Sequence, residues 1–491
     1  MNVQRKIACL CGMLVFLAVA GGCVSYAFAA ESSFEVSGWI PYWRGVQGIA
    51  NIAPRLNTFT EVNPFMYGVT ADGSLTAHSS LSKAEWGILR ENSKNMNVRF
   101  VPTIMWSDAD AMESVLGNAD TRRTHVRAIA REVYTYDLDG IDIDYEGKYA
   151  RTAPYFSQFL KELYEAIGYD KWVMCTIESR TPLDSRYSSP ESTPKDIEYA
   201  NDFKIIGTYC DRVRIMAYDQ MRIDLKLNSA NADPYIPVAD IAWVEKVMRL
   251  AAEDISKDKL VIGVPTYGYE YDMFPASWDP SDFEYSKLWA FNPQYAVDLS
   301  AKIGQSITRN SAGELSLVFP ASLSPEFKPL PNATRIVTWS DGEAIRKKAE
   351  LAKSLGLRGI AIFKIDGGQD ASVWSIAEEF KGNSRSKKAP DVVLGLAREA
   401  PESGNGSAPT IPIPTRNLSP GTVGDDVKNL QKFLNKHGFT IAASGVGSPQ
   451  NETTYFGNGT YRALIKFQQA NKISPATGYF GPKTRAKMQS L

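Results

Sequence analysis

Short β-rich runs alternate with helical patterns between residues 34 and 363, and this alternation predicts βα units around a parallel sheet. One interval carries an apolar stripe at helical spacing, from Phe156 to Ile167, which predicts a helix over residues 152–168. The predicted strands are 34–43, 58–69, 99–105, 140–146, 172–178, 213–218, 260–267 and 359–363. Eight strands with intervening helices fit an α/β fold, the TIM (β/α)8 barrel.

The interval before the last predicted strand is much longer than the others. It runs from Tyr267 to Gly359, which is too long for one loop and one helix. We expect a small α+β insertion at about residues 286–336, over one side of the barrel mouth. Closer to the last strand, Ser340 followed three residues later by Glu343 predicts a capping box, and Gly356 marks the end of that helix.

The chain changes character after the last strand. Residues 382–416 are rich in Gly, Ser, Pro and charge, which is typical of a linker. Residues 417–491 again carry amphipathic helical patterns, and the phrase Phe-Gly-x-x-Thr occurs there twice, at 456–460 and 480–484. In each copy the Thr lies near a helix start, where its hydroxyl can cap free amides. We expect a small three-helix domain.

The first residues are typical of a leader rather than of a fold. Arg5 and Lys6 precede a short apolar run at 7–20, and small residues follow, ending at Ala29. The run is too short for a stable membrane span. We therefore expect a signal peptide over residues 1–29 and a secreted or cell-wall-associated protein. A lipoprotein anchored at Cys23 is the alternative.

The charge, cysteine and histidine content limits the kinds of binding partner and cofactor that we expect. The chain has 54 basic and 55 acidic residues, a balance that points to neither nucleic acid nor an acidic membrane surface. Without the leader only Cys175 and Cys210 remain; they could form a disulfide or pack as two buried thiols. The three histidines, at 78, 125 and 437, are scattered. We expect no metal, no cofactor and a monomer.

The fourth predicted strand carries three acids. Side chains on a strand alternate, so Asp142, Asp144 and Glu146 point into the barrel, while Ile141, Ile143 and Tyr145 face the helices. Glu146 lies at the carboxyl end, where barrel active sites open. Crowding and partial burial should raise its pKa, which suits a general acid. A salt-bridge cluster or a cation site is the alternative, but cation ligands prefer flexible loops.

These residues carry a family resemblance. Asp139-Gly140-x-Asp142-x-Asp144-x-Glu146 resembles the fourth-strand signature of glycoside hydrolase family 18, the chitinase-like enzymes. Met216-Ala217-Tyr218-Asp219 resembles the Met-x-Tyr-Asp motif of the same family. The similarity covers about residues 34–381, so we place the catalytic domain at 30–381.

The resemblance implies a retaining, substrate-assisted mechanism. Glu146 would protonate the glycosidic oxygen, and the sugar's own acetamido oxygen would attack the anomeric carbon. Asp144 would orient the acetamide, and Asp142 would share a proton with Asp144. Tyr218 would hydrogen-bond the acetamide oxygen, with Asp219 and Met216 lining the same pocket.

Two departures from the family pattern bear on the substrate. The third strand reads Val-Pro-Thr-Ile-Met-Trp at 101–106 where the family often has Ser-x-Gly-Gly, and Phe363 stands where a Trp usually lies under the sugar. Both argue against chitin. The segments 38–43, 63–67 and 267–269 look similar to the spore-cortex-lytic glucosaminidase branch. Their tyrosines Tyr42, Tyr67 and Tyr269 are candidate sugar contacts alongside Phe363.

The final domain resembles the peptidoglycan-binding module of wall hydrolases. The matching residues are Gly424, Val427, Leu430, Gln431, Leu434, the two Phe-Gly-x-x-Thr turns, Phe467 and Gln468. Together the resemblances imply a secreted glycosidase that cleaves β-1,4 linkages of N-acetylglucosamine-containing glycans, above all bacterial peptidoglycan. One alternative is a chitinase or chitooligosaccharide hydrolase. The other is a non-catalytic glycan-binding lectin, although such lectins usually lack the terminal acid and this chain keeps Glu146.

Overall fold

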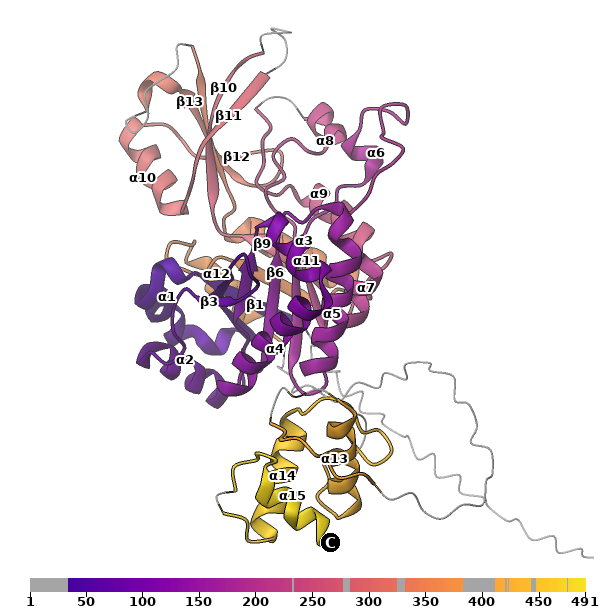
Figure 1. Cartoon of the computed structure of the whole chain (residues 1–491). Coiled ribbons are helices and arrows are strands. Elements are labelled where there is room, and N and C mark those ends of the chain that lie inside the picture. Colours follow the sequence, from indigo (N-terminus) through magenta and orange to yellow (C-terminus); the bar gives the residue numbers. More distant parts are fainter. Residues whose placement is uncertain are drawn as a thin grey trace, which may run out of the picture.

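The computed structural model describes residues 34–231, 234–276, 283–324, 332–382, 411–419, 422, 424–442, 447–474 and 476–491. They form a barrel, a second sheet inserted near one end of it, and a small helical domain (Figure 1). The predicted leader with Cys23 lies outside these residues, as does most of the predicted linker. Among the described residues, none of the helices has the length and apolar character that crossing a membrane requires.

The barrel is a closed parallel sheet. Its strands are β1 (Glu35–Ile40), β2 (Glu61–Val69), β5 (Thr103–Trp106), β6 (Gly140–Tyr145), β7 (Trp172–Glu178), β8 (Arg212–Met216), β9 (Leu260–Pro265) and β15 (Gly359–Phe363). Each pairs in parallel with the next, and β1 pairs with both β2 and β15, which closes the ring. Two short strands, β3 (Leu75–Ala77) and β4 (Arg99–Phe100), pair with β2 outside this circuit. The predicted TIM barrel is confirmed.

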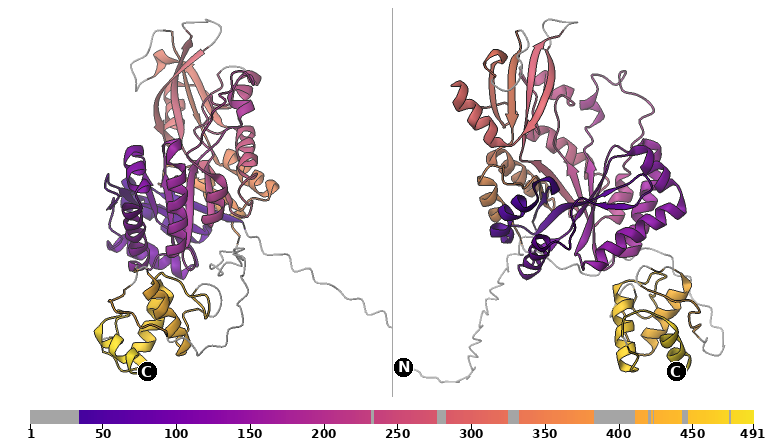
Figure 2. Two further views of the ribbon diagram at one scale, coloured as in Figure 1. Left: turned by 45° about the vertical axis from the view of Figure 1, so that its right-hand side comes forward. Right: turned by 60° about the vertical axis from the view of Figure 1, so that its left-hand side comes forward.

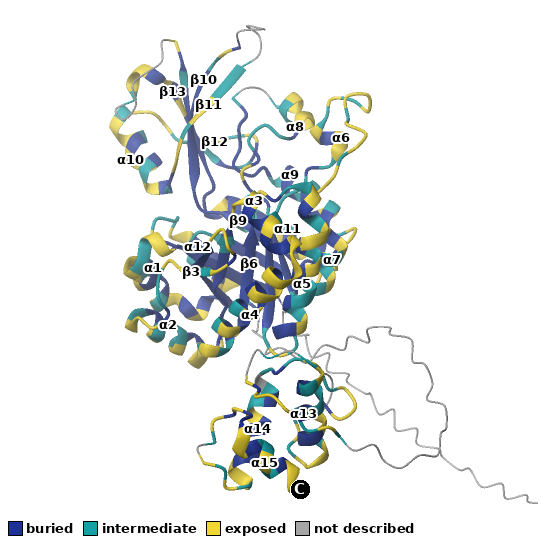
Figure 3. Ribbon diagram, viewed as in Figure 1, coloured by how far each residue is buried: buried dark blue, intermediate teal, exposed yellow. Residues whose placement is uncertain are grey.

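Helices surround the barrel, and the strands between them are buried (Figure 3). The helices that follow the strands are α1 (Gly45–Ile52), α2 (Ala84–Asn95), α3 (Ala109–Gly117), α4 (Ala119–Thr135), α5 (Ala153–Ile167), α6 (Leu183–Arg186), α7 (Phe203–Tyr209), α8 (Leu225–Ala230), α9 (Ile241–Ala251), α11 (Gly342–Leu355) and α12 (Ser372–Phe380), with 3₁₀ turns η1 (Tyr42–Arg44), η2 (Ala53–Thr58) and η3 (Ala150–Thr152). The predicted apolar stripe of α5 is buried against the barrel, since Phe156, Phe159, Leu160, Leu163 and Ile167 all belong to its core.

The start of α11 differs from the prediction. The N-cap is Asp341, whose carboxylate accepts a hydrogen bond from the amide of Ala344, so the capping box at Ser340 is wrong. The Ser340 hydroxyl instead donates to Glu314 in the inserted sheet, at 3.1 Å. The helix does end at Gly356, whose φ of 71° is the left-handed conformation that glycine adopts readily.

The insertion is an antiparallel sheet with the order β11-β10-β14-β13-β12. Its elements are β10 (Gly268–Pro275), β11 (Phe283–Phe291), α10 (Pro293–Ile303), β12 (Thr308–Arg309), β13 (Leu315–Pro320), η4 (Ala321–Leu323) and β14 (Thr334–Trp339). It therefore extends beyond the predicted range 286–336 on both sides. β10 begins so soon after β9 that the two strands lack a turn signal between them in the sequence.

The described residues of the C-terminal domain contain three helices, α13 (Asp425–Lys436), α14 (Asn458–Ala470) and α15 (Pro482–Gln489), around a hydrophobic cluster of their own. The two threonines of the Phe-Gly-x-x-Thr phrases do not cap helices as predicted. Thr460 accepts a hydrogen bond from the Gln431 amide at 2.9 Å, and Thr484 accepts one from Gln468 at 3.0 Å. Each phrase thus joins one helix start to a glutamine of the preceding helix. In Figures 1 and 2 this domain and the inserted sheet lie at opposite ends of the barrel.

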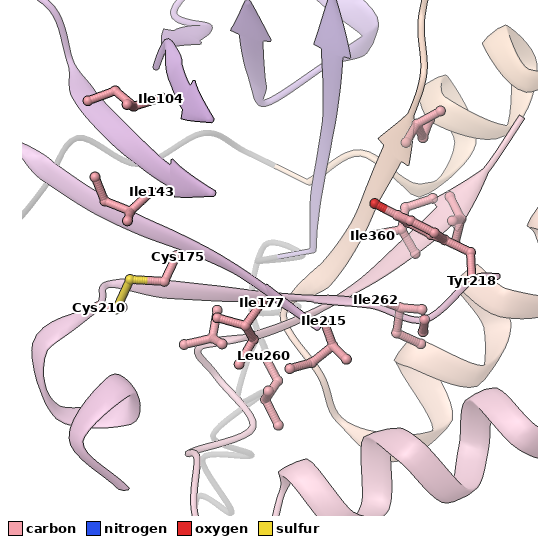
Figure 4. Close-up of a cluster of buried hydrophobic side chains, with 14 of the residues drawn as sticks. Ile104, Ile143, Cys175, Ile177, Cys210, Ile215, Tyr218, Leu260, Ile262 and Ile360 are labelled. Atoms are coloured by element: carbon pink, nitrogen blue, oxygen red, sulfur yellow. A yellow bond between two sulfur atoms is a disulfide. The ribbon is translucent and has the colours of Figure 1, made fainter. Parts of the chain in front are cut away.

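Cys175 of β7 and Cys210, which follows α7, form a disulfide inside the barrel wall (Figure 4). Both residues are fully buried, and their Cα atoms are 5.9 Å apart. The alternative of two separate buried thiols is therefore not what the structure shows.

We expect replacement of both cysteines by alanine to lower the free energy of unfolding by about 2–4 kcal/mol, because the bond constrains the unfolded chain. Denaturant unfolding of protein lacking residues 1–29 measures this change. Alkylation of this same protein, with both cysteines present, unfolded and without reductant, should add no mass. Labelling of two thiols would contradict the disulfide.

Candidate active site

A cavity of about 580 Å³ opens at the carboxyl end of the barrel strands. The barrel strands and the residues that follow them supply most of its lining, and the inserted sheet supplies one wall. The lining residues are Trp39, Trp43, Phe65, Met105, Asp144, Glu146, Thr176, Met216, Tyr218, Asp219, Tyr267, Tyr269, Trp289, Ala290, Phe291, Asn292, Phe363 and Lys364. This is the place where barrel enzymes carry their active sites.

The alternation predicted for β6 is present. Asp142 and Asp144 are buried in the interior, while the ring of Tyr145 packs outward on Phe159 of α5 with centroids 5.4 Å apart. The Tyr145 hydroxyl lies 2.5 Å from Nε2 of His125 on α4. The apolar face of β6 therefore packs against the surrounding helices, and its acidic face points into the barrel interior.

Asp142 lies below the cavity and is fully partnered. Its Oδ2 accepts hydrogen bonds from Nε1 of Trp39 at 3.0 Å and from Oγ1 of Thr103 at 2.9 Å. Its Oδ1 accepts one from Oγ1 of Thr176 at 2.9 Å and lies 2.8 Å from Nη1 of Arg214. These partners come from four strands other than β6.

Asp144 and Glu146 line the cavity and have few partners. Burial, together with the neighbouring charges of Glu146 and Asp142, raises the pKa of Asp144 well above its usual value. Its Oδ1 is buried and has no hydrogen-bond partner among the described residues. Burial and the charge of Glu178 raise the pKa of Glu146, while Lys148 opposes the increase. Glu146 is thus suited to hold a proton where an ordinary carboxyl would have lost it.

The backbone just after Glu146 is held by two groups that the sequence analysis missed. Glu178, the last residue of β7, accepts hydrogen bonds from the amide of Gly147 and from Asn201, both at 2.7 Å. The Lys148 ammonium lies 3.6 Å from Glu178 and donates to the carbonyl of Tyr145. The sequence did offer a signal for Glu178, because a carboxylate at the carboxyl end of a barrel strand lies where barrel active sites open.

Tyr218 and Asp219 follow β8, and both reach the cavity. Burial and the nearby Asp144 charge raise the pKa of the Tyr218 phenol well above its usual value, so it stays protonated and can donate. Asp219 has a φ of 58°, a left-handed conformation that is uncommon for residues other than glycine. Its Oδ1 accepts hydrogen bonds from the hydroxyls of Tyr267 at 2.6 Å and Tyr269 at 2.9 Å. Met216 lines the same wall.

Aromatic rings surround the acids. Phe363 lies nearly parallel to Tyr218, with centroids 5.8 Å apart, and meets the edge of Trp39 at 6.0 Å. Trp43 is 53% exposed and Trp289 37% exposed, and both line the cavity. Neither tryptophan was among the predicted contacts.

Two predicted sugar contacts lie elsewhere. Tyr67 is buried, and its hydroxyl donates to Glu132 of α4 at 2.9 Å. The pairing of β2 with β5 shifts register between Phe65 and Tyr67, so Phe65 faces the cavity instead. Tyr42 stacks on His78, with centroids 4.1 Å apart, and does not line the cavity.

Among the residues that the structure describes, no group of three or more histidine, cysteine, aspartate or glutamate side chains is placed to hold a metal ion. Asp142, the acid below the cavity on β6, has its oxygens occupied by protein donors. Carboxylates, phenols and aromatic rings make up most of the site, with Thr176, Asn292 and Lys364 as further polar lining residues.

Known proteins resemble both parts of the chain. The C-terminal residues 423–488 match the family described as "Putative peptidoglycan binding domain". The Cortical fragment-lytic enzyme of Bacillus subtilis is 23% identical over 278 residues, covering 56% of this chain and 58% of its own. Class V chitinase CHIT5 of Lotus japonicus is 21% identical over 352 residues, covering 69% of this chain and 84% of its own.

The barrel also resembles solved structures. The Bacillus megaterium spore cortex-lytic enzyme SleL has a TM-score of 0.54 at 21% identity, with 73% of this chain and 76% of that chain covered. At this identity the likeness shows the fold alone. The model of the Glycosyl hydrolases family 18 matches residues 39–368, which is more than half of the chain and includes both acidic motifs. The chain therefore belongs to the Glycosyl hydrolases family 18 and is a glycoside hydrolase.

Proposed function

We propose that this glycoside hydrolase cleaves β-1,4 linkages of N-acetylglucosamine-containing glycans with retention, by substrate-assisted catalysis, and that its substrate is bacterial peptidoglycan. The observation that carries the mechanism is the pairing of Glu146 with the buried, unpartnered Oδ1 of Asp144 in one cavity. The observation that favours the wall is the peptidoglycan-binding domain in the same chain.

In the first step Glu146 transfers its proton to the glycosidic oxygen as the bond to the anomeric carbon breaks. The acetamido carbonyl oxygen of the same sugar attacks that carbon from the opposite face and forms an oxazolinium ion. Oδ1 of Asp144 accepts the acetamide N–H, and the Tyr218 hydroxyl donates to the acetamide oxygen. Glu146, now a carboxylate, takes a proton from the water that opens the ring, so two inversions give retention.

Substrate recognition uses the aromatic rings that line the cavity, together with the C-terminal domain. Trp43, Trp289 and Phe363 offer faces on which sugars stack. A tethered wall binder raises the local concentration of catalyst at an insoluble substrate. Similar proteins include cortical fragment-lytic enzymes, which supports a wall substrate, and a class V chitinase, which keeps chitin as the second candidate. An exported protein, cleaved after Ala29 or anchored at Cys23, fits either substrate.

Wild-type protein should release reducing ends from purified peptidoglycan, and Glu146→Gln should lower this rate about 10²–10⁴-fold because the proton donor is lost. Mass spectrometry of the products identifies the bond that is cleaved. Glu91→Gln, an exposed residue of α2, is the matched control and should keep full activity.

The same assay tests which polymer is the substrate and whether its acetamido oxygen is the nucleophile. Peptidoglycan from which the acetyl groups have been removed should resist cleavage, because the attacking oxygen is absent. Cleavage of chitin oligomers alone would replace peptidoglycan by chitin in the proposal. Binding to glycans without hydrolysis of any of them would favour the lectin hypothesis.

The pH dependence of kcat/KM should respond oppositely to two substitutions beside Glu146. Activity requires protonated Glu146, so the alkaline limb follows its pKa. Glu178→Gln removes the charge that raises this pKa and should move the alkaline limb to lower pH by about one unit. Lys148→Met removes the opposing charge and should move it to higher pH. Shifts in the same direction would contradict this assignment.

Deleting residues 417–491 should weaken binding to insoluble peptidoglycan about a hundredfold or more while leaving turnover of soluble oligomers unchanged. The barrel and the tail have separate hydrophobic clusters, so each keeps its core. Sedimentation with purified sacculi measures the first quantity, and product release measures the second. Unchanged sedimentation would show that the tail does not bind the wall.

A further inference from the structure

Lys364, which directly follows β15, brings a positive charge to a cavity whose other charged residues are acids. The charged lining residues are Asp144, Glu146, Asp219 and Lys364, so Lys364 alone is basic among the lining residues that the structure describes. In the closed ring of strands, β9, β8 and β7 separate β15 from β6 on one side, and β1, β2 and β5 separate them on the other. Lys364 and the acids of β6 therefore lie on opposite sides of the mouth.

The Lys364 side chain is held by two acceptors. Its ammonium donates to Oδ1 of Asn292 at 2.8 Å and to Oδ2 of Asp366. Asn292 directly follows β11, so the ammonium joins the barrel to the inserted unit. The Lys364 backbone is fixed as well, because its amide donates to Oγ1 of Thr266 at 2.8 Å and its carbonyl accepts from the same hydroxyl at 2.6 Å.

These contacts leave the Lys364 ammonium with hydrogen-bonding capacity to spare. An ammonium has three N–H donors, and two acceptors contact this one among the described residues. The single carboxylate in contact with it, Asp366, is buried and also lies 3.9 Å from Nε of Arg44, so two basic side chains share one negative charge. Because the Lys364 side chain is 16% exposed and lines the cavity, a ligand there can reach it.

We propose that Lys364 is a specificity-determining residue that donates to the lactyl carboxylate of an N-acetylmuramic acid, the sugar next to the N-acetylglucosamine whose acetamide Asp144 orients. The inference rests on the proposed function and adds to it a residue that separates peptidoglycan from chitin. Every sugar of chitin has a hydroxyl group at C3, whereas N-acetylmuramic acid carries there a lactyl ether that ends in a carboxyl group. Hydrogen bonds from an ammonium to a carboxylate are among the stronger ones in proteins.

The geometry of a β-1,4 glycan brings this carboxylate to the side of the mouth where Lys364 lies. Each sugar is turned over relative to its neighbours, so the edge that carries C2 and C3 alternates from one side of the chain to the other. When N-acetylglucosamine presents its acetamide to Asp144 on the β6 side, the adjacent N-acetylmuramic acid presents its C3 edge to the opposite side. The acids of β6, which would repel a carboxylate, are then across the cavity from it.

The test uses one soluble oligomer in two forms. The first is an alternating oligomer of N-acetylglucosamine and N-acetylmuramic acid without stem peptides, and the second is the same oligomer with its lactyl carboxyls reduced to alcohols. Wild type should cleave the acid form with a kcat/KM about tenfold or more above that of the alcohol form, because the alcohol cannot form the charge-assisted hydrogen bond. Lys364→Met should abolish this preference, and Lys364→Arg, which keeps the charge, should retain part of it.

A purely structural role for Lys364 predicts a different result. If the side chain only holds Asp366 and Asn292 in place, Lys364→Met lowers kcat/KM for both forms by the same factor and the preference for the acid form remains. That outcome would overturn the inference. Lys302→Met replaces an exposed lysine of α10 and is the matched control, which should keep the wild-type preference.

A second variant and the wild type itself cover the case in which Lys364→Met does not fold, as judged by its melting temperature. Lys364→Gln keeps a donor for Asp366 or Asn292 without the charge, and it should also lose the preference. Wild type that cleaves both forms equally well contradicts the inference alone and leaves the proposed function intact. Cleavage of chitin oligomers with neither form of the alternating oligomer cleaved contradicts the wall substrate, and this inference with it.

Discussion

The site depends on the cost of placing carboxylates inside a closed barrel. A buried carboxylate is stable only when donors or cations surround it, or when it keeps a proton. At the bottom of the barrel, burial would raise the pKa of Glu35, but Arg99 and Arg212 outweigh it and the pKa falls far below its usual value. At the mouth, burial raises the pKa values of Asp144 and Glu146 instead. The number of basic partners therefore decides which acids are structural and which can exchange protons.

The inserted antiparallel sheet forms one wall of the cavity that contains Asp144 and Glu146. Tyr269 of β10 holds Asp219, and Trp289 of β11 contributes an exposed ring to the cavity wall. The sheet has its own internal support, since the fully buried Arg335 binds Glu270 and Asp272 at 2.7 Å each. Glu314 connects the sheet to the barrel by accepting hydrogen bonds from the amides of Val238 and Ala239, in the loop before α9. Buried ion pairs and hydrogen bonds thus hold the wall in place, as the proposed function requires of a cavity that orients an acetamide.

Features that follow from a repeating pattern along the chain could be predicted from the sequence. Alternation on β6 placed Asp142 and Asp144 in the interior, and alternating strands and helices indicated the barrel. The partners of Asp142 could not be predicted, because Trp39, Thr103, Thr176 and Arg214 come from separate strands whose register the sequence does not reveal. Tyr67 does not line the cavity, because a register shift in β2 between Phe65 and Tyr67 changes the alternation there. The boundary of the insertion was missed because β9 and β10 follow one another with little between them.

In the C-terminal domain, the residues that match the family pattern are core residues and not a binding surface. The residues that carry its resemblance to the peptidoglycan-binding module, among them Val427, Leu430, Leu434 and Phe467, are buried in its core. Gln431 and Gln468 are also buried, and each fastens one Phe-Gly-x-x-Thr turn to a helix. The matched pattern therefore describes how the domain folds, and under the proposed function contact with the wall falls to exposed residues outside it. Under the proposed function the two domains divide the work accordingly: acids at the barrel mouth select an N-acetylated sugar, and the surface of the tail selects the polymer in which that sugar is found.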